Sequence, residues 1–403
     1  MVASGRTMKI SIIYDFLKEF GGLERVLFFQ ARVLSKKFKP ELKFSFIGVP
    51  KHNDIGEQMG EGVDVRISQI GGGRSEFLEL VRSFLFPSRV NQLKTDLIIS
   101  HSFMATRMAY YFKKKRIPYI VMIHHPPNFL YNRSLLWANN PLRFIIYVVA
   151  GVIGGVLRAV DRKVVGKADC VIANSEFTAR RVEDIYGICP EVIYPSVSSR
   201  FKRMDSEAAQ KILARFQLSP RTILLHGRMI KDKRPEWAIK AFSRIQHQIP
   251  HMLVVTGTIE ARKRLDNLIS ELNIQQRVRI LGRISDEELV ALYSSASCFL
   301  MSAPREDFGL TPVEAMSCGC PVVGWKDGAG PEETIIDGTS GFLAKPYLID
   351  DYSEKIKEAT NKEWDINAIV FHAKKYSEDS IAAGFLKIVE KVIQSSESGR
   401  ITS

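Results

Sequence analysis

The feature that most constrains the fold of this chain is the regular alternation of short apolar runs with segments of helical spacing. Apolar strands between helices are typical of parallel sheets that helices cover on both faces. The runs fall into two series, 9–14, 43–47, 96–100, 119–124 and 170–174, then 223–226, 253–256, 278–281, 298–301 and 321–324. Two such series in 403 residues predict an α/β chain of two doubly wound domains.

The break between the two series lies in the mostly polar stretch 198–206. We therefore expect an N-terminal domain over 1–198, a C-terminal domain over 199–378, and a final helix and tail over 379–403. The last helix, at about 380–395, has apolar residues at helical spacing, namely Ile381, Phe385, Ile388, Val389, Val392 and Ile393. The tail from Ser396 is expected to be disordered.

An acidic segment in the second domain, 306–315 (EDFGLTPVEA), places Glu306 and Glu314 eight positions apart. Pro312 suits the first turn of a helix, where its missing N–H costs nothing. The free N–H groups of a helix start bind anions, and one carboxylate can accept two hydrogen bonds from a vicinal diol. The segment thus suits a nucleotide-sugar, although helix capping beside a surface glutamate gives the same spacing.

Two cations follow a strand of the same domain, Arg228 next to Gly227, and Lys233 five positions later. An arginine fork and a mobile lysine at a strand end can grip a diphosphate and stabilise it as a leaving group. In other transferases metal ions stabilise the leaving diphosphate. Since Arg228 and Lys233 would do so here, we predict no metal and no cofactor. The alternative is a pair of salt-bridged surface cations.

These motifs, in this order, resemble those of glycosyltransferase family 4, whose retaining enzymes have the GT-B fold. The similarity covers its E-x7-E signature at 306–314, its G-R-x4-K pattern at 227–233, and further steps at 281–289 (LGRISDEEL) and 328–341 (GAGPEETIIDGTSG). The resemblance implies two Rossmann-like domains with a cleft between them and a C-terminal helix that crosses back to the N-terminal domain.

The resemblance also implies roles by position. Glu306 would contact hydroxyls of the donor sugar and Glu314 those of the ribose. Backbone groups around Arg283 and Ile284 would hold the base. Backbone N–H groups near sugar and phosphate would come from Phe308, Gly309, Leu310 and Thr311.

Two segments of the first domain resemble the same family. Gly21 and Gly22 follow the first strand in a loop that would approach donor phosphate and acceptor. Residues 123–131 (IHHPPNFLY) are similar to a segment of some members, many of them mannosyltransferases, and place His124 as the active-site histidine. Asn128 replaces the usual arginine, which leaves the sugar and acceptor open. His101 is interpreted as structural.

Nearly all the excess positive charge lies in residues 1–200, which carry a net +12 of the total +13. Such a surface indicates a polyanionic partner or is simply basic. The stretch 74–89 has apolar residues at helical spacing among Arg74, Arg82 and Arg89, which fits a membrane-surface helix and a core helix equally. Residues 135–157 are a second interfacial candidate. No apolar run is long enough to span a membrane, and we expect no signal peptide.

We therefore expect a metal-independent, retaining glycosyltransferase that moves a sugar, with mannose favoured, from a nucleotide-sugar to a lipid-linked or glycan acceptor. It would act at the cytoplasmic face of a membrane, in peripheral contact with anionic lipid. Nucleic acid is not expected, since no stacking-aromatic motif accompanies the basic half. The alternatives are a catalytically inactive GT-B partner subunit and a GT-B nucleotide-sugar epimerase.

Overall fold

The computed structural model describes residues 8–17, 21–47, 65–70, 94–113, 116–131, 141–218, 221–260 and 262–401, with the single positions 79, 82 and 86. The chain divides into two compact units. Unit 1 comprises Met1–Tyr194 and Ile381–Ser403, and unit 2 comprises Pro195–Ser380. The sequence placed these boundaries at 198 and 378.

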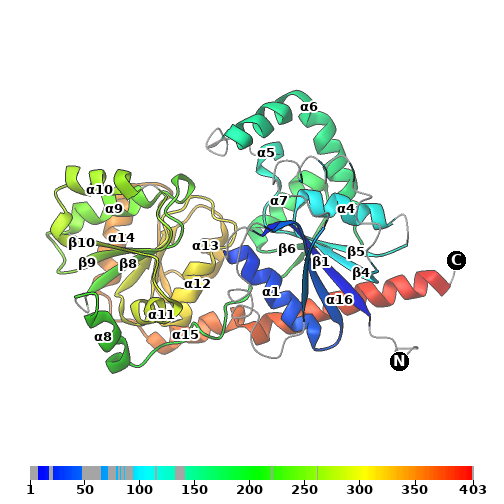
Figure 1. Cartoon of the computed structure of the whole chain (residues 1–403). Coiled ribbons are helices and arrows are strands. Elements are labelled where there is room, and N and C mark those ends of the chain that lie inside the picture. Colours follow the sequence, from blue (N-terminus) through cyan, green and yellow to red (C-terminus); the bar gives the residue numbers. More distant parts are fainter. Residues whose placement is uncertain are drawn as a thin grey trace. The chain divides into compact units, whose positions relative to one another are not determined.

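Unit 1 is a sheet of seven described strands in the order β3-β2-β1-β4-β5-β6-β7, and all of its described strand pairs are parallel (Figure 1). The strands are β1 (Lys9–Leu17), β2 (Lys39–Ile47), β3 (Arg66–Gln69), β4 (Leu97–Ser100), β5 (Tyr119–Ile123), β6 (Cys170–Ala173) and β7 (Glu191–Val192). Its helices include α1 (Gly22–Ser35), α4 (Phe103–Lys113), α5 (Asn128–Tyr131), α6 (Pro141–Val165) and α7 (Glu176–Tyr186).

Alternate residues of these strands point to opposite faces, and helices bury both faces. Ile10 and Ile12 pack with α1 and α16 (Glu378–Ile401), whereas Ile13 packs with α4 and α7. This burial on both sides explains why the strands are continuously apolar.

The C-terminal helix α16 crosses back to the sheet of unit 1, as expected. The six apolar residues that the sequence aligned on one side of this helix all belong to the α1 core (Figure 1, red). The expected disorder from Ser396 is wrong, because the helix continues to Ile401.

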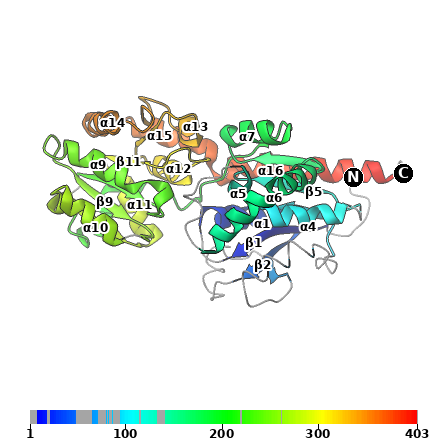
Figure 2. The ribbon, with the colours of Figure 1, turned by 90° about the horizontal axis from the view of Figure 1, so that it is seen from above.

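Unit 2 is a second parallel sheet of six described strands, in the order β10-β9-β8-β11-β12-β13. Figure 2 shows β9 and β11 of this sheet among the helices of the unit. The strands are β8 (Thr222–His226), β9 (Met252–Thr256), β10 (Val278–Gly282), β11 (Cys298–Leu300), β12 (Val322–Trp325) and β13 (Gly341–Ala344). The helices include α8 (Ser206–Ala214), α9 (Pro235–Ile245), α10 (Arg262–Glu271), α11 (Asp286–Ser295), α12 (Leu310–Ser317), α13 (Gly330–Thr334), α14 (Ile349–Asn361) and α15 (Ile366–Ala373).

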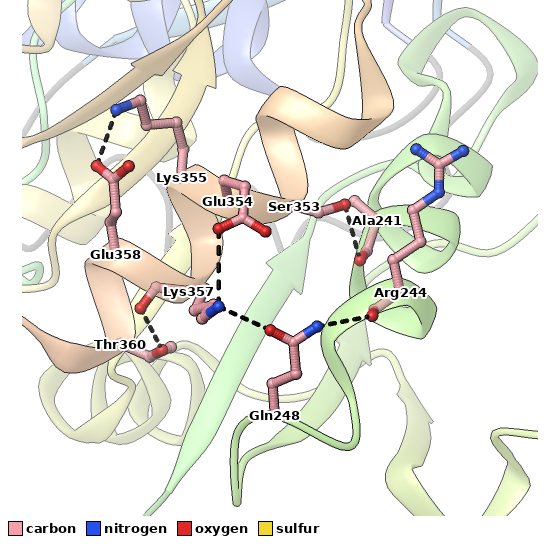
Figure 3. A network of polar contacts seen from close by, with 9 residues as sticks. All are labelled: Ala241, Arg244, Gln248, Ser353, Glu354, Lys355, Lys357, Glu358 and Thr360. Atoms are coloured by element: carbon pink, nitrogen blue, oxygen red, sulfur yellow. Dashed lines mark hydrogen bonds and ion pairs between the residues drawn. The ribbon is translucent and has the colours of Figure 1, made fainter.

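Helices α9 and α14 pack together over one face of this sheet. Buried Ser353 of α14 donates a hydrogen bond to the carbonyl of Ala241 at 3.1 Å, and Lys357 donates to the amide oxygen of Gln248 at 2.7 Å (Figure 3). Beneath them the Trp325 ring stacks on Tyr352 at 4.3 Å. These contacts hold β12 in place. The residues that follow β12 contact the loop that carries Glu306.

The α/β class with two doubly wound units is confirmed, and each of the ten predicted runs overlaps one strand. The sequence missed β3, β7 and β13. All three strands are short. Strands β3 and β7 also carry polar or half-exposed residues, so these two show no continuous apolar run. All five cysteines are free thiols.

Candidate functional site

The two predicted cation positions of unit 2 lie on the loop between β8 and α9. Lys233 ends a single 3-10 turn, and its carbonyl accepts a hydrogen bond from the Ser302 hydroxyl at 3.0 Å. Its ammonium lies 2.5 Å from a carboxylate oxygen of Glu306, with 32% and 22% of the two side chains exposed. Arg228 is exposed on the same loop. The fold thus joins Lys233 and Glu306, which the sequence separates by 73 positions.

Three neighbouring strands of this sheet each have a glycine at their C-terminal end. Gly227 follows β8, Gly257 follows β9 and Gly282 ends β10, each with positive φ. A Cβ on Gly257 would lie 2.0 Å from the carbonyl oxygen of Gly227, so only glycine fits there. Sequence reasoning missed Gly257, although a glycine directly after an apolar strand was the available signal. The turns expose Arg283, whose Nε donates to Thr258 at 3.1 Å, and leave Ile284 half-buried.

The acidic segment forms a loop and a helix start. Gly309, at φ 83°, is the N-cap of α12, and no side chain among the described residues caps this helix. Because the helix begins at Leu310, Pro312 is its third residue, within the first turn as expected, and Glu314 falls in the second turn. The N–H groups of Gly309, Leu310 and Thr311 are those that lack partners within the helix, which is the geometry of an anion site.

The loop that carries Glu306 is braced by the segment after β12. Gly330 N–H donates to the Glu306 carbonyl at 2.9 Å, and a Cβ on Gly330 would lie 2.4 Å from Phe308 Cα. Asp327 accepts from the N–H of Arg305 at 2.8 Å and from the hydroxyl of Tyr347 at 3.0 Å. Sequence reasoning missed Asp327, a carboxylate that holds the backbone just before Glu306.

Two predicted donor-binding residues are buried. Phe308 is 3% exposed, and its ring meets Tyr376 edge-on at 5.6 Å. Glu314 is also 3% exposed. The side chain of Phe308 therefore anchors the loop, which leaves only its backbone to face a ligand.

In unit 1 the structure brings together two histidines that follow neighbouring strands, His101 after β4 and His124 after β5. His101 Nδ1 lies 2.9 Å from His124 Nε2, and the rings stack at 5.2 Å. Burial lowers the pKa of His124 to about 3 and lowers that of His101 well below its usual value, so both imidazoles are neutral. His101, interpreted as structural, contacts His124 and so orients its ring.

The direction of this hydrogen bond follows from burial. His101 Nε2 is buried with no hydrogen-bond partner among the described residues. An unpartnered acceptor is tolerated better than an unpartnered N–H. The favoured tautomer of His101 therefore has its proton on Nδ1 and donates to His124 Nε2, which leaves the proton of His124 on Nδ1.

Buried Asp15, near the end of β1, was also missed by sequence reasoning. It accepts a hydrogen bond from the N–H of Ala105 at 3.1 Å, in the first turn of α4. Burial raises its pKa to about 6, and the hydrogen bonds oppose this shift only in part. An aspartate inside an apolar strand was the sequence signal.

Gly21 and Gly22 begin α1, with Gly21 as its N-cap. The Gly21 N–H donates to the carboxylate of Glu24 at 2.9 Å, in a capping box. A carboxylate of the chain itself thus occupies the Gly21 amide, and Gly22 is exposed beside it. An anionic ligand would meet this amide only if Glu24 moved.

The predicted helix 74–89 lies outside the described residues, apart from Glu79, Arg82 and Phe86. In this stretch Glu79 is fully buried and pairs with Arg82 at 3.2 Å, while Phe86 is 56% exposed. Among the described residues, no group of three or more His, Cys, Asp or Glu side chains could hold a metal ion.

Two family models match nearly the whole chain. Residues 20–200 match Glycosyltransferase Family 4, and residues 209–383 match Glycosyl transferases group 1. The boundary between the matches lies close to the boundary between the two units.

Curated relatives match more partially. Alpha-1,3/1,6-mannosyltransferase ALG2 of Homo sapiens is 28% identical over 218 residues, 49% of this chain and 51% of that protein. D-inositol 3-phosphate glycosyltransferase of Streptomyces bingchenggensis is 27% identical over 309 residues, 72% and 65% of the two. The chain thus spans about half to two thirds of the length of these relatives.

Solved structures match over the full length. The crystal structure of Anabaena Alr3699/HepE in complex with UDP has a TM-score of 0.73 at 19% identity, covering 95% of this chain and 100% of that one. Sucrose-phosphate synthase from Thermosynechococcus elongatus has a TM-score of 0.73 at 17% identity, covering 96% and 100%. At these identities the likeness establishes the fold, which is GT-B.

Proposed function

This chain belongs to glycosyltransferase family 4, and on that premise we propose that it transfers a sugar, with retention of configuration, from a nucleotide-sugar to a lipid-linked acceptor. The observation that carries the proposal is the Lys233–Glu306 pair of unit 2, beside the uncapped start of α12. A cation, a carboxylate and free backbone N–H groups are the chemistry that a sugar diphosphate requires.

In this proposal Glu306 accepts hydrogen bonds from hydroxyls of the donor sugar, and Lys233 has two tasks. Without ligand it neutralises Glu306 at 2.5 Å. With a donor bound, its ammonium and exposed Arg228 meet the diphosphate and stabilise the negative charge that grows on the leaving group. The N–H groups at the start of α12 add to this stabilisation, because a helix start favours negative charge.

The nucleoside part of the donor would bind at the glycine turns after β9 and β10. The base would lie against the backbone of Arg283 and Ile284, and buried Glu314 would hold the ribose hydroxyls. Lys233 and Arg228 would supply the positive charge that a metal would otherwise provide, so we propose transfer without a required metal.

Unit 1 would contribute His124 as a neutral group. Because burial lowers its pKa to about 3, His124 is uncharged at neutral pH and would not act there as an imidazolium acid. Its Nδ1–H can still donate a hydrogen bond to a sugar or acceptor oxygen, and His101 fixes that tautomer.

The relatives favour two features of the substrates. One relative is named as a mannosyltransferase and another as an inositol-phosphate glycosyltransferase, while the HepE structure contains UDP. We propose mannose as the first sugar to test, with a lipid-linked glycan as acceptor, at the cytoplasmic surface of a membrane. In the described residues no helix is long and apolar enough to cross a bilayer.

A donor screen by thermal shift tests the proposal. GDP-mannose, UDP-glucose, UDP-N-acetylglucosamine, UDP-galactose and the nucleoside diphosphates would each be added with and without chelator. A ligand of the folded state raises the melting temperature by mass action. We expect a shift with one nucleotide that the chelator leaves unchanged and that Lys233→Gln abolishes.

The donor that binds would then be incubated, labelled in its sugar, with lipid extract. Label in the lipid phase supports transfer. Free nucleotide with an altered sugar and no acceptor would instead indicate an epimerase. A shift without turnover on any acceptor would indicate a binding subunit, and a shift that needs added metal would overturn the metal-independent mechanism.

A further inference from the structure

Helix α6 has one face that the other described residues of unit 1 leave uncovered. Large apolar side chains are exposed along it, namely Phe144 (53%), Ile145 (52%), Val148 (48%), Val152 (82%) and Val156 (66%). At 3.6 residues per turn these five positions fall within about a third of the helix circumference. From Phe144 to Val156 this apolar face extends for roughly 18 Å along the axis. Monomeric proteins rarely expose a contiguous apolar surface of this kind unless it binds something.

The opposite face of α6 is packed. Leu157, Asp161, Val164 and Val165 are buried, and they fall on the other side of the helix from Val152. This face contacts α4, α5 and α7. Figure 1 shows α6 at the outer side of α5 and α7, farther from the sheet than either. The helix is therefore held on one side and open on the other.

Two cations continue the apolar face at its C-terminal end. Arg162 and Lys163 come eighteen residues after Phe144 and Ile145, which is five full turns, so they lie on the same side. Both are exposed. The acidic residue of this helix, Asp161, is only 2% exposed and accepts hydrogen bonds from the hydroxyls of Tyr131 at 2.9 Å and Tyr186 at 2.7 Å. The open face of α6 thus combines apolar and cationic side chains with no exposed carboxylate among its described residues.

We propose that this face of α6 docks into the headgroup region of an anionic bilayer, a role that rests on the proposed lipid-linked acceptor. Apolar side chains would enter the boundary between headgroups and acyl chains, and Arg162 and Lys163 would meet lipid phosphates. A second copy of the chain is the less suitable occupant. Two α6 faces packed together would bury these cations against apolar side chains, and neither helix offers an exposed carboxylate to pair with them.

The buried face of α6 connects this docking surface to the predicted acceptor segment. Tyr131 is the last residue of α5, and α5 follows directly on His124 through residues 125–127. Arg158 donates to the carbonyl of Leu130 at 3.3 Å, and Leu157 packs against Leu130. Asp161 ties both α5 and α7 to the same helix. Docking through α6 would therefore hold the His124 segment close to the bilayer surface, where a lipid-linked acceptor presents its headgroup.

The test is sedimentation of the purified full chain with sucrose-loaded vesicles, either of phosphatidylcholine alone or of equal parts phosphatidylcholine and phosphatidylglycerol. We expect binding to the anionic vesicles and much less to the neutral ones. The double variant V152E/V156E should reduce the partition coefficient by at least about tenfold, because it places two charges in the apolar boundary. The double variant R162Q/K163Q should weaken binding only to anionic vesicles and make it less sensitive to salt.

Matched controls lie in unit 2. Phe371 of α15 is 74% exposed, so Phe371→Glu makes the same kind of change on another helix. Arg262 and Lys263 form an exposed adjacent pair at the start of α10, so R262Q/K263Q matches the cation variant. Both controls should bind vesicles as the unaltered chain does. Circular dichroism and melting temperature should show that all variants are folded, as expected for changes at exposed positions.

Several outcomes would overturn the proposal. These are no vesicle binding by the unaltered chain, binding that survives V152E/V156E, or a dimer in light scattering that V152E/V156E dissociates. The last result would assign the face to a second copy. Failure of the proposed function would look different, with no donor-induced thermal shift while vesicle binding and its variants behave as expected. If both proposals hold, V152E/V156E should lower turnover on a vesicle-borne acceptor but leave turnover on a water-soluble, short-chain acceptor unchanged.

Discussion

The two units place opposite kinds of chemistry at the ends of their strands. In unit 1, His101 and His124 are packed against each other and kept neutral by burial, and Asp15 is buried beside the start of α4. In unit 2, Lys233 and Glu306 remain partly exposed as an ion pair. Burial fixes the position of a polar side chain but disfavours its charged form. A group that must bind a diphosphate needs its charge and access to solvent. The two edges should therefore respond differently to substitution and to pH.

The largest effect on stability is expected from Gly330→Ala in unit 2. The new Cβ would lie 2.4 Å from Phe308 Cα and 2.6 Å from the Asp307 carbonyl oxygen, and backbone atoms cannot move aside cheaply. We expect a loss of about 3 kcal/mol in the free energy of unfolding, measured by denaturant titration. The control Gly328→Ala meets no atom within 4 Å and should cost only about 1 kcal/mol, for its φ of +76°. Equal losses in the two variants would show that the close approach is not what holds the loop.

The next effect concerns the charged edge. Glu306→Gln removes the carboxylate that pairs with Lys233 while keeping the size of the side chain. We expect turnover of the proposed transfer to fall about 100-fold, equivalent to about 2.7 kcal/mol, with the fold intact. The control is Glu358→Gln, which removes a similar Glu–Lys pair, at 2.8 Å from Lys355 in α14. Near-normal turnover in Glu306→Gln would remove this residue from the site.

The neutral state of His124 in unit 1 should be visible in the pH dependence of stability. The pKa of His124 is about 3 in the folded chain and about 6.5 when unfolded, so the unfolded state binds the proton first as pH falls. Between pH 7 and pH 5 the unaltered chain should lose about 2 kcal/mol more unfolding free energy than His124→Phe. Comparing the two chains cancels the opposite contribution of Asp15, whose raised pKa stabilises the fold on acidification. Parallel pH profiles would mean that His124 is not held neutral.

The smallest effect is expected at a glycine of unit 1. Gly155 is exposed within α6, and a Cβ there would meet no atom within 4 Å. Gly155→Ala should stabilise the chain by up to about 1 kcal/mol, because alanine loses less backbone entropy in a helix. A rise of the melting temperature checks this, and a fall would reveal a packing role for the open face of α6.

Much of unit 2 was predictable because its information is local. The turn residues Gly227 and Gly282, the serine at 285 and the acidic segment lie next to the strands and helices that they end or begin. Ser285 caps α11, accepting from the Glu288 N–H at 3.2 Å. Pro312 lies in the first turn of α12, as its sequence position indicated, but Gly309 at positive φ begins the helix two residues before the proline.

Unit 1 was less predictable because its site depends on partners distant in the sequence. His101 was taken as structural because a histidine after a strand has no local signature. Its contact with His124 exists only because β4 and β5 are neighbours in the sheet, so that their ends lie side by side. Likewise the capping of Gly21 by Glu24 decides whether this amide is available, and that depends on a side-chain rotamer.

The sequence by itself determined the two doubly wound units and which residues carry charge or backbone freedom at the strand ends. These follow from periodicity and turn chemistry, which act over a few residues. Only the tertiary structure decided that Lys233 neutralises Glu306, that the two histidines are neutral, and that α6 buries its aspartate while exposing its valines. Charge state and exposure depend on what lies within a few ångströms in space, and in a parallel sheet those neighbours come from distant parts of the chain.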